Sequence, residues 1–236
     1  MFFDPLYIFV ILICTGFSLY ASSITKSRFQ KYSQYTTRSR MTGAEVAQRI
    51  LQDNNIHDVK IERVGGKLSD HYDPSSKTLR LSTDVHDRNS MAAFGVAAHE
   101  VGHAIQHAQA YGFLSFRSAW VPVANLGSGL SFIVIFIALM MGGAQTATGA
   151  SLSWLGVLLF GCTTIFTLVT LPVEFDASKR ALACLRKGNY VAEKELDGAR
   201  KVLNAAAMTY VAAFASSLLM LLYYAFRLGL IGGRRN

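Results

Sequence analysis

Charged residues are scarce in this chain of 236 residues, where Asp, Glu, Lys and Arg make up only 16%. An average soluble domain contains about 25%. The deficit is concentrated in three stretches that hold no charged residue, 5–25, 118–173 and 202–226. A bilayer span needs about 20 predominantly apolar residues, so each stretch is long enough to cross a membrane. The composition therefore argues against a soluble domain and favours an integral membrane protein.

The middle stretch is too long for one span and is interrupted by GGAQTATGA at 142–150. We expect two spans there, 121–141 and 152–171, joined by a short turn. With the first and last stretches the total is four membrane helices. None of the expected spans contains His, Asp or Glu, which argues against a metal transporter, because such a protein would carry its ligands inside the membrane.

Basic residues are absent before the first span and abundant after it. A secretory signal peptide has the opposite order, so we expect a retained anchor with its N-terminus outside. Residues 26–120 and 173–207 then lie inside and hold 13 and 7 of the 23 Lys and Arg residues, in agreement with the positive-inside bias. A fourth span leaves Arg227, Arg234 and Arg235 outside. Either the last helix is not a full span, or the charge bias fails at this end.

Paired cysteines and nucleic-acid features are also lacking. The three Cys residues form no CxxC pair, which fits a reducing compartment. No basic helix with interleaved aromatics suggests nucleic acid, and the net charge of +8 is mostly juxtamembrane. It is best explained by contact with anionic lipid headgroups. We therefore expect a multi-pass protein of a bacterial cell (plasma) membrane, with the lipid bilayer as its partner.

The region between the first two spans has signals for a small mixed domain. TGAEVAQRIL begins with a capping box of Thr42 and Glu45 ahead of an apolar-periodic helix. VKIERVGG alternates like a strand, and KLSDHYDPSSKTLRLS predicts two strands about a turn at 73–76. Ser90 can cap a long helix that runs to about residue 110.

That last helix carries HEVGH, an H-E-x-x-H motif at 99–103. His99 and His103 are one turn apart on one face, so both imidazoles can bind one zinc ion. Glu100 lies on the same arc, where its carboxylate can take a proton from zinc-activated water. The alternative to a metal site is an ordinary helix with partly buried, hydrogen-bonded histidines.

The motif needs a third ligand from elsewhere. His107 lies about 12 Å from His99 along a straight helix, too far to share an ion, and the metzincin pattern fails because residues 106 and 109 are Gln. LPVEFDAS places Glu174 just past the third span, and Pro172 fits the first turn of a new helix. On that helix Glu174 would face the same side as Ser178. Spacing alone is equally compatible with a solvated flanking residue.

HEVGH followed by LPVEFDAS after a transmembrane hairpin resembles the YugP-type family of neutral zinc metallopeptidases, which is similar in layout to the HtpX heat-shock protease and the CAAX-prenyl proteases. The wider group has a third ligand in an E-x-x-A-D pattern, and matching it implies Glu174 as that ligand. Its final Asp supports a zinc-binding histidine. Here that position is Ser178, while an Asp occurs earlier at 176, so the supporting partner is either Asp176 or Ser178.

The resemblance implies an α+β, mostly α fold: a four-helix integral membrane protein with a cytoplasmic HExxH (gluzincin-like) metallopeptidase domain that carries a small β-sheet. The expected parts, in order, are an N-terminal transmembrane anchor (1–25), a cytoplasmic catalytic region (26–120), a transmembrane hairpin (121–172), cytoplasmic helices with the third ligand (173–207), and a C-terminal transmembrane helix and tail (208–236).

The implied function is a Zn²⁺-dependent endopeptidase acting on membrane or membrane-proximal proteins, with His99, His103 and Glu174 as ligands and Glu100 as general base. The strand at 78–82 is expected to offer an edge to an extended peptide. His71 and Tyr72 have suitable chemistry for an oxyanion stabiliser, whereas His57 and His86 are expected to be solvated. The alternative function is a non-catalytic membrane protein with a structural zinc site.

Overall fold

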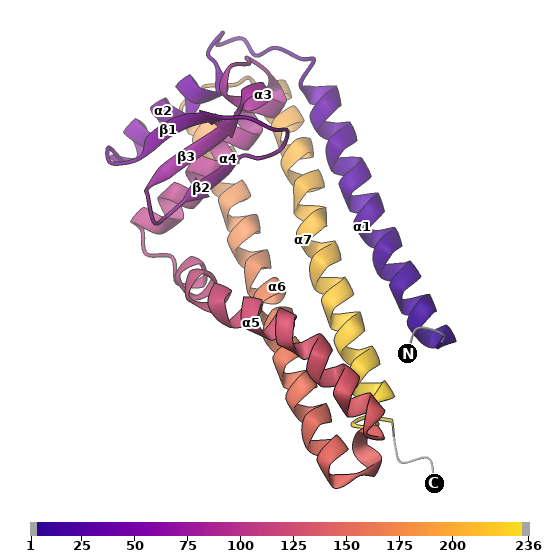
Figure 1. Ribbon diagram of the computed structural model, residues 1–236. Coiled ribbons are helices and arrows are strands. Elements are labelled where there is room, and N and C mark those ends of the chain that lie inside the picture. The colour runs from indigo at the N-terminus through magenta and orange to yellow at the C-terminus, as the bar shows by residue number, and fades with distance from the viewer. Residues whose placement is uncertain (1–3, 233–236) are drawn as a thin grey trace. The chain divides into compact units, whose positions relative to one another are not determined.

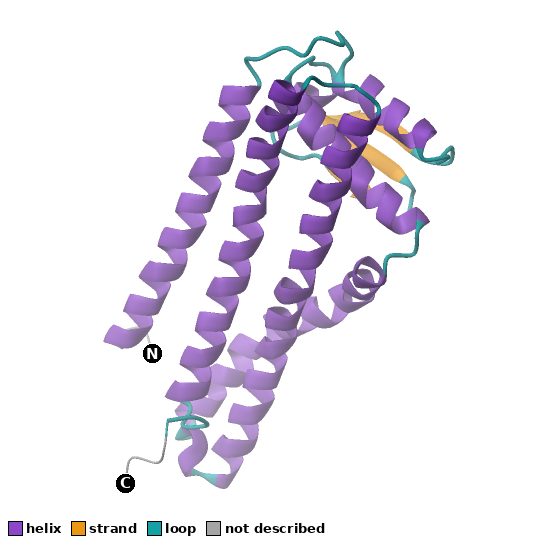
Figure 2. Ribbon diagram, turned by 180° about the vertical axis from the view of Figure 1, so that it is seen from behind, coloured by secondary structure: helices purple, strands orange, loops and turns teal. Residues whose placement is uncertain are grey.

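The computed structural model describes residues 4–232, and this part of the chain is mostly helical (Figures 1 and 2). The elements in chain order are α1 (Pro5–Tyr32), α2 (Gly43–Asp53), β1 (Lys60–Val64), β2 (His71–Asp73), β3 (Thr78–Ser82), α3 (Thr83–His86), α4 (Met91–Ala108), α5 (Gly112–Met140), the 3-10 turn η1 (Gly143–Gln145), α6 (Ala147–Lys187) and α7 (Glu193–Arg227).

Within the described residues, α1, α5, α6 and α7 are long and apolar enough to cross a membrane. In the most apolar window of each helix, only 17 to 28% of the residues are buried inside the protein. Most residues in these windows are therefore exposed or partly exposed, as expected of helices with a face toward lipid. Four apolar helices agree with the four expected from the uncharged stretches.

The chain divides into two compact units. One comprises Met1–Tyr20, Phe116–Thr170 and Tyr210–Asn236, and the other comprises Ala21–Ser115 and Leu171–Thr209. The first unit consists of apolar helix segments and the α5–α6 turn. The second holds the sheet, α2, α3 and α4, together with the remaining segments of the long helices.

In the first unit, the residue before α1 contacts the end of α7, and the residue after α7 contacts the turn between α5 and α6. The Asp4 carboxylate accepts a hydrogen bond from the Tyr223 hydroxyl at 3.0 Å and pairs with Arg227 Nε at 3.1 Å. The backbone N–H of Ala144 donates to the Leu228 carbonyl at 3.0 Å. Arg227, whose charge conflicts with the positive-inside bias, thus has an acidic partner. Arg234 and Arg235 lie outside the described residues.

In the second unit, the local signals in the sequence produce the expected elements. Thr42 Oγ accepts from the Glu45 N–H at 3.2 Å while the Thr42 N–H donates to the Glu45 carboxylate at 2.7 Å, so the capping box that begins α2 is confirmed. Ser90 Oγ accepts from the Ala93 N–H at 3.1 Å and caps α4. Both caps satisfy donors that a helix N-terminus otherwise leaves without a partner.

The sheet has three strands in the order β1-β3-β2. β1 pairs with β3 in parallel, and β2 pairs with β3 as an antiparallel hairpin. The expectation that 78–82 forms an edge strand is therefore wrong. β1 occupies the side of β3 that a simple hairpin would leave open, so β3 is central and β2 is the edge strand on the other side.

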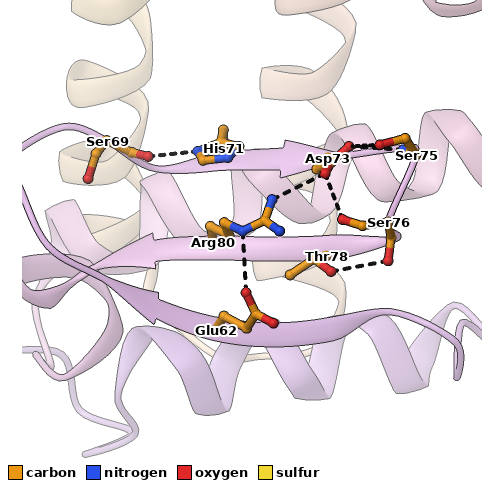
Figure 3. A network of polar contacts seen from close by, with 8 residues as sticks. All are labelled: Glu62, Ser69, His71, Asp73, Ser75, Ser76, Thr78 and Arg80. Atoms are coloured by element: carbon orange, nitrogen blue, oxygen red, sulfur yellow. Dashed lines mark hydrogen bonds and ion pairs between the residues drawn. The ribbon is translucent and has the colours of Figure 1, made fainter.

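The two faces of this sheet differ in chemistry. Leu79 and Leu81 of β3 are fully buried in a core that also contains side chains of α2, α4, α6 and α7. The opposite face is polar: Arg80 lies 3.3 Å from Glu62 and 3.2 Å from Asp73, and so joins all three strands (Figure 3). The core face is thus the one turned toward α4.

Candidate metal centre

The two histidines of HEVGH lie one turn apart on α4 and face each other. Their ring centroids are 4.8 Å apart, with the planes nearly perpendicular at 84°. His103 is buried and His99 is partly buried. The i, i+4 spacing on a regular helix is sufficient for this arrangement, which is why it can be deduced from sequence.

Glu174 of α6 completes the group. One oxygen of its buried carboxylate, Oε2, lies 3.2 Å from His99 Nε2 and 3.6 Å from His103 Nε2. One ligand atom from each of the three residues lies within 4.8 Å of the others. Two imidazole nitrogens and one carboxylate oxygen converging on a point are the donor set of a catalytic zinc site with a fourth position left open. The residues therefore fit a zinc ion.

A close approach of α4 and α6 brings these ligands together. Gly102 lies on α4 between the two histidines, and a Cβ atom built at this glycine would be 2.5 Å from the carbonyl oxygen of Ala177 on α6. Real Cβ atoms essentially never lie closer than 3.0 Å to another heavy atom. The absence of a side chain at Gly102 and the small one at Ala177 thus allow the backbones to approach.

The expectation that Pro172 begins a new helix is wrong. α6 is continuous from Ala147 to Lys187, with Pro172 inside it. A proline inside a helix removes its own N–H from the ladder and its ring crowds the carbonyl four residues earlier, but membrane helices tolerate both where neighbouring groups satisfy the backbone. As a consequence, Glu174 belongs to the same helix as the third expected span, 152–171.

Both histidines have a partner for their second ring nitrogen. His99 Nδ1 lies 3.1 Å from the Ser178 hydroxyl, and His103 Nδ1 lies 3.0 Å from Gln106 Oε1. Gln106 in turn donates to the carboxylate of Asp176 at 2.9 Å. Ser178 and Asp176 therefore serve different histidines, the first directly and the second through Gln106.

Nearby negative charge and burial shift the pKa of His103 in opposite directions. Burial by itself lowers the pKa of this imidazole, but the hydrogen bond and negative charge of Glu174, together with Glu100 and Gln106, outweigh it, and the pKa is raised. A metal ligand must be deprotonated. Protons therefore compete with a metal ion at His103 up to a higher pH than they would at an isolated histidine.

Glu100 lies beside this group with its side chain inward. The residue is only 8% exposed, and its negative charge raises the pKa values of both His103 and Asp70. A buried carboxylate near two imidazoles that could bind a metal ion is suited to accepting a proton from a water molecule that approaches the same point.

Asp70, just before β2, is a neighbour of Glu100 that the sequence patterns did not single out. Its carboxylate accepts from the Ser82 N–H at 2.7 Å and from the Ser82 hydroxyl at 3.0 Å. Burial raises the pKa of Asp70, the bonds from Ser82 lower it, and the charge of Glu100 adds to the increase. The net shift is upward. The Asp70 side chain thus adds hydrogen bonds between the start of β2 and the end of β3, close to Glu100.

The remaining histidines lie away from the three ligands. His107 Nδ1 is 2.9 Å from the Tyr72 hydroxyl, so Tyr72 is on the core face and its hydroxyl is engaged there. His71 pairs across the ladder with Arg80 and is exposed on the opposite, polar face, 2.8 Å from the Ser69 carbonyl (Figure 3). It cannot stabilise an oxyanion at α4. His57 is exposed, and His86 pairs with Asp87 at 2.7 Å.

Comparison with known proteins gives a family whose description names zinc. The profile of a family described as "Putative neutral zinc metallopeptidase" matches residues 7–229. A protein of Bacillus subtilis named "Putative membrane protease YugP" is 42% identical over 219 residues, which cover 93% of this chain and 95% of the relative. No solved structure matches the chain.

Proposed function

The chain belongs to this family of neutral zinc metallopeptidases, and from that premise we propose that it is a membrane-bound, zinc-dependent endopeptidase. The observation that carries the proposal is the convergence of His99, His103 and Glu174 within 4.8 Å of one another. The buried Glu100 beside them is the second component that hydrolysis requires. We assign the first three residues as metal ligands and Glu100 as the catalytic base.

In this proposal each residue has a defined task. His99, His103 and Glu174 would hold a zinc ion, which when bound would supply Lewis acidity toward the scissile carbonyl and toward water. Glu100 accepts a proton from the attacking water on a carboxylate oxygen and then donates it to the nitrogen of the leaving amine. Ser178 and Gln106 orient the imidazoles so that Nε2 of each faces the Glu174 carboxylate.

We assign the substrate to the edge strand β2. α4 packs against β2 and β3, and the hydroxyl of Tyr72 on β2 bonds to His107 one turn beyond His103. β2 is paired on one side only, so an extended peptide can add to its open side and lie along α4. Recognition of a peptide through main-chain hydrogen bonds is the usual result of strand addition. It requires an extended segment in the substrate.

We place the site on the cytoplasmic side of a bacterial plasma membrane. Three segments expected outside contact one another: Asp4 pairs with Arg227, and Ala144 bonds to Leu228. An even number of spans requires both chain ends on one side, which this clustering supports. The positively charged segments 26–120 and 173–207 belong to the other side, where anionic headgroups are the expected lipid partners. Substrates are then membrane proteins or membrane-proximal segments.

The decisive experiment compares the unmodified protein with Glu100→Gln in membranes of cells that lack the chromosomal gene. Glutamine has nearly the same shape but cannot accept the proton, so we expect normal zinc content and a loss of cleavage of about 10²–10⁴-fold. New protein N-termini, quantified by mass spectrometry across the membrane proteome, are the measurement. If the two proteins bind zinc equally and yield the same N-termini, the site is structural and the proposal fails.

A further inference from the structure

Gln106 is an unusual residue for the interior of α4. It is fully buried, at 0% exposure, on a helix whose other buried residues are mostly small or apolar. A buried amide is costly unless its donors and acceptor are all satisfied. Here they are, because Nε2 donates to the Val173 carbonyl at 2.8 Å and to Asp176 at 2.9 Å, while Oε1 lies 3.0 Å from His103 Nδ1.

These partners determine which way the amide points. Nε2 has two hydrogens, and both are used by oxygen acceptors on α6. Turning the amide over would set Oε1 against a carbonyl and a carboxylate, where there is no proton to share. Asp176 is itself held by an ion pair with Arg180, whose Nη1 donates to Gln109 Oε1 at 2.6 Å. The side chain of Gln106 is therefore locked with its oxygen toward His103.

The fixed orientation of the Gln106 amide determines the tautomer of His103. An amide oxygen only accepts hydrogen bonds, so the hydrogen of the neutral imidazole must be on Nδ1. Nε2, which lies 3.6 Å from Glu174 Oε2, is then left with a free lone pair. His99 differs, because its neighbour is the hydroxyl of Ser178, which can either donate or accept. At Nδ1, therefore, only His103 has a partner that accepts and cannot donate. The Nε2 atoms of both histidines face Glu174 Oε2, at 3.2 Å for His99 and 3.6 Å for His103.

We propose that Gln106 is a positioning residue that fixes the tautomer and ring orientation of His103 for metal binding, with Asp176 and Arg180 holding it in place. In many metal sites a carboxylate or carbonyl contacts the ligand histidine directly. In this chain the carboxylate of Asp176 contacts Gln106 instead of His103, and the amide of Gln106 contacts the imidazole. The inference rests on the zinc site of the proposed function.

The first test measures zinc affinity by competition with a chromophoric chelator, on full-length protein in detergent after metal removal. Gln106→Met has a similar length and no acceptor for the His103 proton. We expect its zinc affinity to fall about 10- to 100-fold, the range for loss of a residue that orients a ligand. Ser178→Ala should lose less, since a hydroxyl does not select a tautomer.

A matched control separates positioning from simple destabilisation. Leu185→Ala removes a fully buried side chain from the same helix as Glu174 without touching a ligand. It should lower the melting temperature of the metal-free protein and leave zinc affinity unchanged. Equal affinities for Gln106→Met and the unmodified protein would overturn the inference. Absence of zinc from the unmodified protein would instead overturn the proposed function.

The second test needs no variant to fold. Nitrogen-15 NMR of histidine-labelled, zinc-loaded protein reports which ring nitrogen of each histidine carries the proton. We expect His103 to carry it on Nδ1 and to bind zinc through Nε2. Zinc bound to Nδ1 with the proton on Nε2 would contradict the assignment of Gln106.

Discussion

Replacement of Gly102 by alanine tests whether the approach of α4 to α6 creates the metal site. The new Cβ would lie 2.5 Å from the carbonyl oxygen of Ala177, and at least 3.0 Å is needed. The difference means that the two backbones must separate by at least about 0.5 Å at this point. A backbone carbonyl cannot rotate away as a side chain can, so the helices themselves must move.

This displacement is large compared with what a metal tolerates. Ligand distances in a zinc site hold to within about 0.2 Å, and the ligands here come from both of the helices that must separate. We therefore expect zinc affinity to fall about 10- to 100-fold, or ~1.4–2.7 kcal/mol. The effect on folding is smaller, because overpacking costs about 1–3 kcal/mol while alanine gains about 0.8–1.0 kcal/mol in helix propensity over glycine.

The assay is chelator competition on metal-stripped protein in detergent, with thermal unfolding measured in parallel. Gly95→Ala is the matched control, since Gly95 lies on the same helix and faces Ala199 of α7 with milder contacts of 3.3–3.4 Å. Gly95→Ala should destabilise the protein less than Gly102→Ala does and should leave its zinc affinity unchanged. If Gly102→Ala binds zinc as tightly as the unmodified protein, close backbone approach does not govern this site.

Three further predictions follow from other contacts. Glu174→Ala should abolish stoichiometric zinc binding while His107→Ala retains it, measured by metal analysis of the purified proteins; loss of zinc in the second variant would show that the ligand set is wrong. In Asp70→Asn the neutral amide still contacts Ser82. Because the folded-state pKa of Asp70 is raised, its stabilising contribution is present below its ordinary pKa and is lost as pH rises through the folded value. The melting temperature of metal-free Asp70→Asn should therefore rise relative to the unmodified protein as pH increases from about 4, and a constant difference would refute this. Thr42→Ala removes the cap of α2 and should cost about 0.5–2 kcal/mol without changing zinc affinity, as unfolding and zinc titrations can check.

The parts of the fold that depend on neighbouring residues were predictable from the sequence. Caps act within three residues, as Thr42 and Ser90 do, and a membrane helix is encoded by one uncharged stretch. The same reasoning gave His99, Glu100 and His103, because their spacing on a single helix turn decides their relative placement. Residue Glu174 came from resemblance to a family, since spacing alone left it open.

What the sequence left undecided involves two or more segments. The position of β3 between β1 and β2 depends on a parallel pairing across the hairpin, for which the local pattern has no signal. The continuity of α6 through Pro172 was also undecided, because a proline at this point is equally compatible with the first turn of a new helix. The role of Gln106 was undecided as well, because a single polar residue on a helix carries no local signal of which other segment it will contact.

The sequence by itself determined that the chain has four apolar helices and an HExxH pair on a fifth. It did so because hydropathy and helical periodicity are properties of consecutive residues. Only the tertiary structure decided that Glu174 meets that pair, and that Ser178 and Gln106 hold separate histidines. These contacts join residues more than 60 positions apart in the case of α4 and α6, and they exist because Gly102 leaves room for two backbones to touch.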